Sequence, residues 1–109
     1  MEREKRRTPR YTFFASAELL ELKSEVRVAS RVSELSLNGC YLDMMNPFPE
    51  GTMVLLKIWA DEKLFAAKAR IIYAQPNMGA GVRFLEVEPQ YQPILQHWLD
   101  VAAGEQKKN

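Results

Sequence analysis

Two short clusters of polar residues in this sequence have the chemistry to hold an anionic ligand, and the first is a run of arginines. Arg6, Arg7 and Arg10 lie close together near the amino terminus. A guanidinium group is a flat fork of donors that can bridge phosphate oxygens, pair with the edge of a guanine base or stack on a purine ring. The alternative is a solvated run of charge, which is the usual state of such a segment.

The second cluster combines a carboxylate, a hydroxyl and a glycine. Glu34 and Ser36 alternate with Leu35 and Leu37, so we expect the polar pair on one face of a strand and the leucines in the core. A carboxylate accepts hydrogen bonds from guanine, and a serine hydroxyl can bind a phosphate or orient a turn. Gly39 lets backbone and ligand approach closely. The alternative is that Glu34 and Ser36 are ordinary exposed residues and that Gly39 serves only a turn.

The sequence offers little else for catalysis or metal binding. His97 is the only histidine and Cys40 the only cysteine, so they cannot make a zinc site without carboxylate help. Gly79-Ala80-Gly81 lacks both the lysine of a phosphate-binding P-loop and the helix that follows a dinucleotide-binding turn. We therefore expect no enzymatic activity, no catalytic residue, no metal site and no cofactor.

Charge is divided unevenly along the chain. Residues 1–10 carry a net charge of +3 and the remaining residues carry −2, which gives a total of +1. A basic arm on a slightly acidic body suggests an anionic partner for the arm alone. A total near zero argues against a dedicated binder of nucleic-acid polymers.

Length and composition predict one cytoplasmic domain. A chain of 109 residues with 47% hydrophobic residues can bury a core without metal or disulfides. It has no apolar run long enough to cross a membrane, no apolar stretch typical of a secretion signal, and a lone cysteine that gives no sign of oxidising conditions. We expect a basic arm at 1–10, a single domain at 11–103 and a tail at 104–109, without membrane insertion.

Alternating apolar residues predict strands through most of the chain, followed by one amphipathic helix. Asn38-Gly39 is the preferred pair for a two-residue hairpin turn, because both positions need a positive φ. Helical spacing runs from Tyr91 to Ala102, with a start expected at Pro93. Strands are expected at 11–22, 25–37, 39–42, 52–60, 63–75 and 81–85. In the fifth of these, one face is formed by Phe65, Ala67, Ala69, Ile71 and Tyr73.

Three motifs, in this order, resemble those of the PilZ domain family. Arg6-Arg7-Thr8-Pro9-Arg10 has the family's arginine-x-x-x-arginine pattern, and Glu34-Leu35-Ser36-Leu37-Asn38-Gly39 resembles its Asp/Asn-x-Ser-x-x-Gly pattern. Gly81-Val82-Arg83-Phe84 resembles the family's final strand. The resemblance covers about residues 6–100 and implies a mainly β fold, a six-stranded antiparallel barrel with a C-terminal α-helix.

The same resemblance implies a function. PilZ domains are receptors for the bacterial second messenger cyclic di-GMP, so we expect a receptor in the control of motility, adhesion or exopolysaccharide that signals to an effector protein. Arg6 and Arg10 would clamp the ligand, and the basic arm would fold over it. The expected ligand-binding residues are Arg6, Arg7, Arg10, Glu34, Ser36 and Gly39.

Glu34 is the departure from the family pattern, which has Asp or Asn at this position. The extra methylene moves the carboxylate by roughly 1 Å or more and adds rotamer entropy that binding must remove. A degenerate PilZ-like module that no longer binds the nucleotide and acts through protein contacts is therefore an open alternative. A third hypothesis, a barrel that grips single-stranded nucleic acid, requires exposed aromatic residues among basic ones, whereas most aromatic residues here alternate as core.

Overall fold

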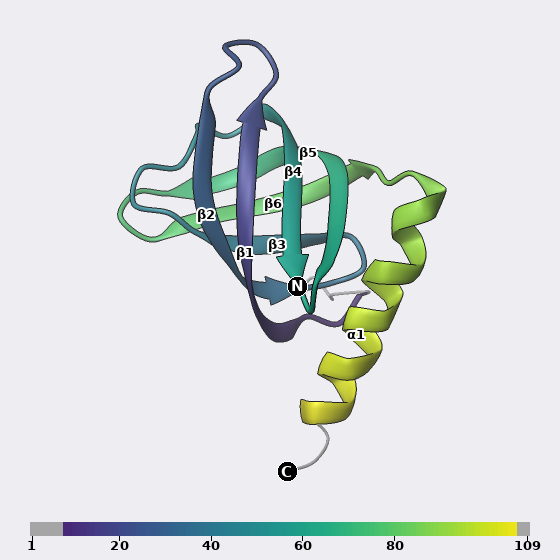
Figure 1. The fold of residues 1–109 in the computed structure, drawn as a ribbon. Coiled ribbons are helices and arrows are strands. Elements are labelled where there is room, and N and C mark those ends of the chain that lie inside the picture. Colours follow the sequence, from purple (N-terminus) through teal and green to yellow (C-terminus); the bar gives the residue numbers. More distant parts are fainter. Residues whose placement is uncertain (1–7, 107–109) are drawn as a thin grey trace.

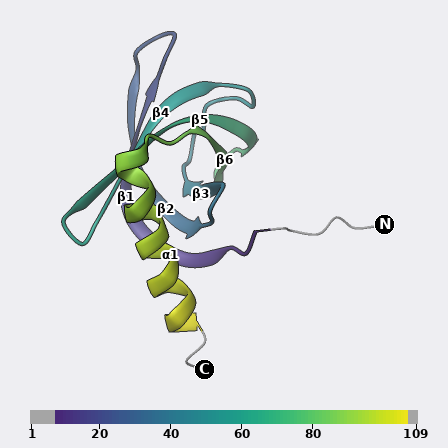
Figure 2. The same ribbon diagram turned by 90° about the vertical axis from the view of Figure 1, so that its right-hand side faces the viewer.

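The computed structural model describes residues 8–106, so Arg6 and Arg7 lie outside the described residues. Six antiparallel strands follow the order β1-β2-β3-β6-β5-β4, and β4 pairs with β1 to close a barrel (Figure 1). Figure 2 shows this ring of strands with the helix α1 at its side. The elements are β1 (Tyr11–Glu21), β2 (Arg27–Leu35), β3 (Gly39–Asp43), β4 (Met53–Ala60), β5 (Lys63–Gln75), β6 (Gly79–Glu86), a 3-10 turn (Pro89–Tyr91) and α1 (Gln92–Gln106). The expected barrel with a C-terminal helix is confirmed.

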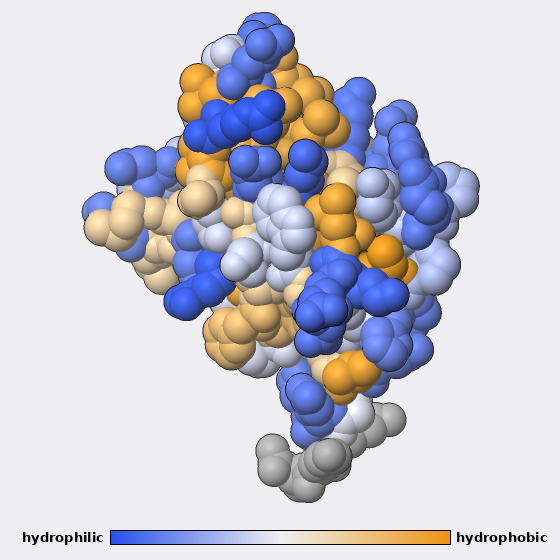
Figure 3. Space-filling view, viewed as in Figure 1, coloured by the Kyte–Doolittle hydropathy of each residue, from blue (hydrophilic) through white to orange (hydrophobic). Residues whose placement is uncertain are grey.

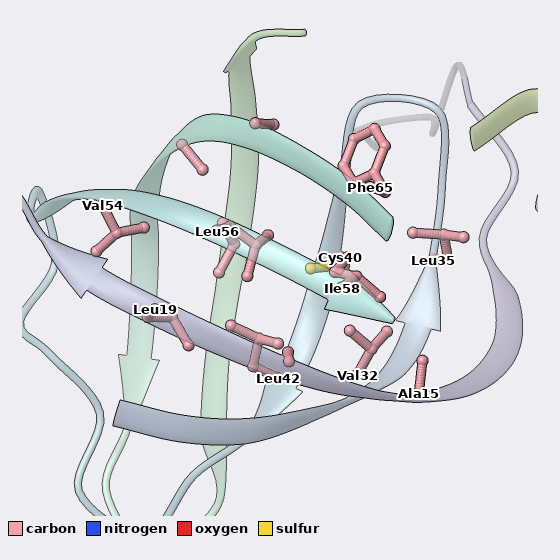
Figure 4. Close-up of a cluster of buried hydrophobic side chains, with 14 of the residues drawn as sticks. Ala15, Leu19, Val32, Leu35, Cys40, Leu42, Val54, Leu56, Ile58 and Phe65 are labelled. Atoms are coloured by element: carbon pink, nitrogen blue, oxygen red, sulfur yellow. The ribbon is translucent and has the colours of Figure 1, made fainter. Parts of the chain in front are cut away.

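Period-two alternation fills the barrel with side chains. In β4, Val54, Leu56 and Ile58 are fully buried, while Leu55 and Trp59, at the alternate positions, face outward. Each strand contributes such a row, and Figure 4 shows the rows meeting inside the barrel. The interior is therefore a packed hydrophobic core, and any binding site must lie on its outer surface or at its ends.

Two connections differ from expectation in their turn chemistry. Neither Asn38 nor Gly39 has a positive φ, so the predicted two-residue hairpin turn at this pair is wrong. The positive-φ pair is Asp61 and Glu62, with φ of 52° and 62°, in the tight β4–β5 hairpin. β2 also begins only at Arg27, two residues after the expected start of this strand at residue 25, and Val26 before it is exposed.

β-bulges in β2 and β5, two strands that β3 and β6 separate in the barrel, reverse the alternation of side chains. In β2 the register shifts between Val32 and Glu34, and in β5 it shifts between Ile71 and Tyr73. Each extra residue turns the next side chain to the opposite face. The prediction that Tyr73 shares a face with Ile71 is therefore wrong: Ile71 is fully buried, whereas Tyr73 is 37% exposed.

The helix α1 packs against the start of β1 and of β5. Its buried face includes Trp98, whose ring lies 5.3 Å from that of Phe13 and 6.3 Å from that of Phe65. The helix begins at Gln92, one residue before the expected start at Pro93, because proline is tolerated in the first turn. It continues to Gln106, beyond the expected domain end at residue 103. Within residues 8–106 no helix is long and apolar enough to cross a membrane.

Candidate functional site

A row of outward-facing residues crosses the wall formed by β1, β2, β3, β6 and β5. The paired positions are Thr12, Glu34, Tyr41, Gly81 and Tyr73, each opposite the next on neighbouring strands. Paired positions have Cα atoms about 4.5–5.5 Å apart, so the row is a continuous surface. It brings together a carboxylate and two phenol rings from segments far apart in the sequence.

The part of this row from Glu34 to Tyr73 lines a cleft with a volume of about 230 Å³. Its floor includes the buried backbone of Gly39 and Gly81, and its rim combines cations, a carboxylate and aromatic rings. The polar and aromatic residues of the lining are Arg10, Glu34, Ser36, Asn38, Tyr41, Tyr73 and Arg83. Four of the six residues expected from sequence, Arg10, Glu34, Ser36 and Gly39, therefore gather here.

Arg10 and Glu34 form an ion pair at the mouth of the cleft. Nη1 of Arg10 lies 3.3 Å from Oε1 of Glu34, and the side chains are 39% and 46% exposed. Exposed pairs of this kind contribute only about 0–1 kcal/mol, because water screens both charges. A ligand that offers an anionic group to Arg10 or hydrogen-bond donors to Glu34 can therefore displace this contact at little cost.

Ser36 organises the loop between β2 and β3. Its hydroxyl donates to the carbonyl oxygen of Gly39 at 3.2 Å and accepts from the backbone N–H groups of Asn38 and Gly39 at 3.3 and 3.2 Å. The residue is buried, so these bonds replace water. Of the two roles expected for this hydroxyl, the geometry supports orientation of the turn.

Leu37 points away from the core, contrary to expectation. β2 ends at Leu35, which is fully buried, and the chain leaves the sheet at Ser36. Strand alternation therefore stops before Leu37, whose side chain is 46% exposed. The loop that replaces the strand is the one that Ser36 holds.

The close approach of β3 and β6 requires a glycine at position 39. It pairs with Arg83 across the β3–β6 ladder, and a Cβ atom at this position would lie 2.0 Å from the carbonyl oxygen of Val82. Any other residue would push β3 away from β6. The expected proximity of ligand and backbone stays a prediction, while this close contact between strands is observed.

The segment before β1 is held against the β2–β3 loop. The Nδ2 group of Asn38 donates to Oγ1 of Thr8 at 2.9 Å, and Arg10 follows two residues later. The backbone N–H of Phe84 donates to the carbonyl oxygen of Asn38 at 2.8 Å, which ties the same loop to β6. The β2–β3 loop therefore holds Thr8 in place and positions Arg10, two residues later, at the cleft.

Two ionisable groups in the cleft have raised pKa values. Burial, with smaller contributions from Tyr73, Asp43 and Glu34, raises the pKa of Tyr41, whose neutral hydroxyl donates to Oε1 of Gln75 at 2.8 Å. Burial raises the pKa of Cys40 to about 12. The thiol is therefore neutral at physiological pH and is a poor nucleophile.

Four polar or aromatic residues of the cleft were not among the ligand-binding residues expected from sequence: Asn38, Tyr41, Tyr73 and Arg83. Arg83 lies within the motif of the final strand, which was the available signal in the sequence, and in the structure it is exposed and pairs with Gly39. Tyr41 and Tyr73 carry no such signal. Their orientation depends on strand register and on the bulge before Tyr73, which alternation along a single segment cannot reveal.

A comparison with models of protein families matches residues 4–100 to the PilZ domain. The chain belongs to the PilZ domain family. No curated protein sequence matches it.

Solved structures share the fold at low identity. The chain is similar to the PilZ domain with c-di-GMP of YcgR from Escherichia coli, with 18% identity, a TM-score of 0.74 and 96% coverage of both chains. It is similar to the PilZ domain of CeSA from a cellulose-synthesizing bacterium, with 19% identity, a TM-score of 0.62 and coverage of 90% of this chain and 98% of the other. It also resembles the Bacillus subtilis inhibitor of motility MotI/DgrA, with 13% identity, a TM-score of 0.74 and coverage of 97% of this chain and 53% of the other.

Proposed function

We propose that this chain is a receptor domain for cyclic di-GMP and acts by binding, without catalysis. One observation carries the proposal: Arg10 and the segment of Glu34 and Ser36 are far apart in the sequence but meet in one cleft. The family assignment supports the same ligand, as does the similarity to a YcgR domain described with c-di-GMP.

The chemistry of the cleft suits a guanine dinucleotide with two phosphates. The Arg10 guanidinium binds a phosphate or the O6 and N7 edge of guanine, and the Glu34 carboxylate accepts from the N1 and N2 hydrogens of the base. Arg6 and Arg7, which precede the described residues, supply further cations, and Ser36 and Gly39 shape the loop and its backbone. Ligand binding would replace the Arg10–Glu34 contact and draw the basic arm over the barrel.

The proposed setting is a cytoplasmic signalling pathway. By analogy with the family, the bound form presents a new surface to an effector protein in motility, adhesion or exopolysaccharide control. The arm is the segment that binding reorders, because it carries +3 while the rest of the chain carries −2.

Calorimetric titration of the whole chain tests the proposal. We expect saturable binding of cyclic di-GMP, with much weaker binding of GTP and cyclic di-AMP at the same salt concentration. GTP lacks the second base, and adenine lacks the N1 and N2 donors that a carboxylate accepts. Equal affinity for the three nucleotides would show that the cleft recognises their negative charge and not their bases.

A second candidate is a module that acts through protein contacts and no longer binds the nucleotide. Glu34 favours it, because the longer side chain reaches Arg10 and occupies the clamp from within the protein. If the unmutated chain binds no cyclic di-GMP while Glu34→Asp gains binding, this second function replaces the first.

A further inference from the structure

Two tyrosine rings lie on either side of a glycine in the cleft. Tyr41 on β3 and Tyr73 on β5 both pair with Gly81 on β6, and their ring centroids are 6.3 Å apart. Most other aromatic residues point into the core or under the helix. An aromatic pair on the outer wall of a binding cleft therefore needs its own explanation.

The Tyr73 ring lies flat on the backbone of β6. A Cβ atom at Gly81 would lie 2.3, 2.5 and 2.9 Å from three consecutive ring carbons of Tyr73, Cε2, Cζ and Cδ2. Nearly equal distances to adjacent ring atoms mean that a face of the ring, not an edge, meets the glycine. The opposite face is turned outward, in agreement with the 37% exposure of the residue. Only glycine at position 81 permits this arrangement.

The bulge in β5 is what places the ring there. Ile71 pairs with Val82 and Tyr73 pairs with Gly81, so Ile72 is the extra residue. In a regular strand without this bulge, Tyr73 would lie on the same face as Ile71 and point into the core. Bulges often redirect side chains beside functional sites. Here the bulge moves an aromatic ring from the core to the cleft.

Two side chains that can form hydrogen bonds with the edge of a base, those of Glu34 and Arg83, lie beside the two rings. Glu34 pairs with Tyr41 in the same row, and its carboxylate contributes to the raised pKa of the Tyr41 phenol. Arg83 lies in the next outward row, opposite Gly39, and lines the same cleft. A flat ring next to an acceptor and a cation suits an aromatic base that stacks and is read along its edge.

We propose that Tyr73 is a stacking platform for a purine base of the bound cyclic dinucleotide, with Tyr41 beside it directing the base edge toward Glu34. The inference rests on the proposed function, since it assigns a base to the same cleft. Base–aromatic stacking strengthens binding by about 5-fold or more per base. The competing role is structural, because an aromatic ring over a strand glycine also stabilises a sheet.

Replacing Tyr73 separates these roles. Tyr73→Phe keeps the ring and should bind cyclic di-GMP within about twofold of the unmutated chain. Tyr73→Leu keeps an apolar cover over Gly81 but removes the π surface, so its affinity should fall about 5-fold or more. The matched control is Trp59→Leu, which removes an exposed aromatic residue from β4 on another wall and should leave affinity unchanged. Calorimetry measures binding, and thermal unfolding shows that the variants are folded.

The ring protons of Tyr73 give a second readout that needs no substitution. Stacking should shift their NMR signals upfield on addition of cyclic di-GMP, because they enter the ring current of the purine. If the unmutated chain binds but Tyr73→Leu binds equally well, or the ring signals stay in place, the platform is wrong and the proposed function stands. If the unmutated chain does not bind cyclic di-GMP, the proposed function fails and the platform fails with it.

Discussion

At the scale of single residues, Glu34 has two possible partners. In the free protein its carboxylate contacts Arg10 at 3.3 Å, while in the proposed complex it accepts hydrogen bonds from guanine. Its side chain is long enough for the first contact because it carries one more methylene than the aspartate typical of the family. In the proposed complex, the balance between these partners would set the affinity of the cleft for cyclic di-GMP.

Substitutions at Glu34 should reveal this balance. Glu34→Asp keeps the charge but shortens the reach toward Arg10, so cyclic di-GMP binding should be equal or tighter. Glu34→Ala removes the acceptor and should weaken binding by about 1–3 kcal/mol, the usual value of a good base contact. Calorimetry at one salt concentration compares them. The matched control is Glu18→Ala, since Glu18 is also a strand glutamate, paired with Arg27 at 3.6 Å, but lies outside the cleft lining.

The carboxylate has no part in recognition if Glu34→Ala changes binding by no more than about 0.5 kcal/mol, the usual limit for exposed positions. Weaker binding by Glu34→Asp would instead show a site built around the longer side chain.

The orientation of Glu34 could be predicted, but the reason for it could not. Counting by two from the buried Val32 puts Glu34 in the core, and the register shift between them reverses this. Alternation with the buried Leu35, which lies beyond the register shift, gave the correct orientation of Glu34. Tyr73 was assigned to the core by alternation with Ile71, which lies on the other side of its register shift. Bulges depend on pairing between distant strands, which a single segment does not encode.

At the scale of elements, α1 holds the start of β1 in place, and the arginine segment directly precedes it. Phe13 in β1 lies against Trp98, and Nε2 of Gln106 donates to the carbonyl oxygen of Thr12 at 3.4 Å. Thr12 in turn pairs with Glu34. The helix and the site are therefore connected through the first residues of β1. Helical spacing predicted the buried face of α1, but its contact with β1 follows from the closed barrel.

Trp98→Ala should destabilise the fold by about 3–5 kcal/mol, because it leaves a cavity between α1, Phe13 and Phe65. Trp98→Phe is the matched control, since it retains a packed ring. The indole Nε1 is buried with no hydrogen-bond partner among the described residues, so phenylalanine loses no polar contact there. Urea unfolding measures the free energy of unfolding of both variants. A loss below about 1 kcal/mol for Trp98→Ala would show that the helix is not part of the cooperative core.

At the scale of the whole molecule, the barrel separates two surfaces. The cleft lies on the wall of β2, β3, β6 and β5, and β4 closes the ring between β5 and β1 (Figure 2). Figure 3 shows apolar side chains gathered around the connection between β1 and β2, where Leu22 and Val26 are exposed. That surface is distinct from the cleft, so contacts made there would not compete with a nucleotide. Strand alternation predicted the strands and the family resemblance implied the barrel, but neither predicted which surfaces the walls of the barrel form.

Mapping by two-dimensional NMR tests the central claim most directly, because it reports binding and its location in one spectrum. On addition of cyclic di-GMP to the labelled chain, we expect the largest amide shifts at Glu34, Gly39 and Gly81, which surround the cleft. The amides of Leu55 and Trp59 on β4 should stay in place and serve as internal controls. The account is contradicted if no amide shifts at saturating ligand, or if the shifts concentrate on β4 while the cleft is unchanged.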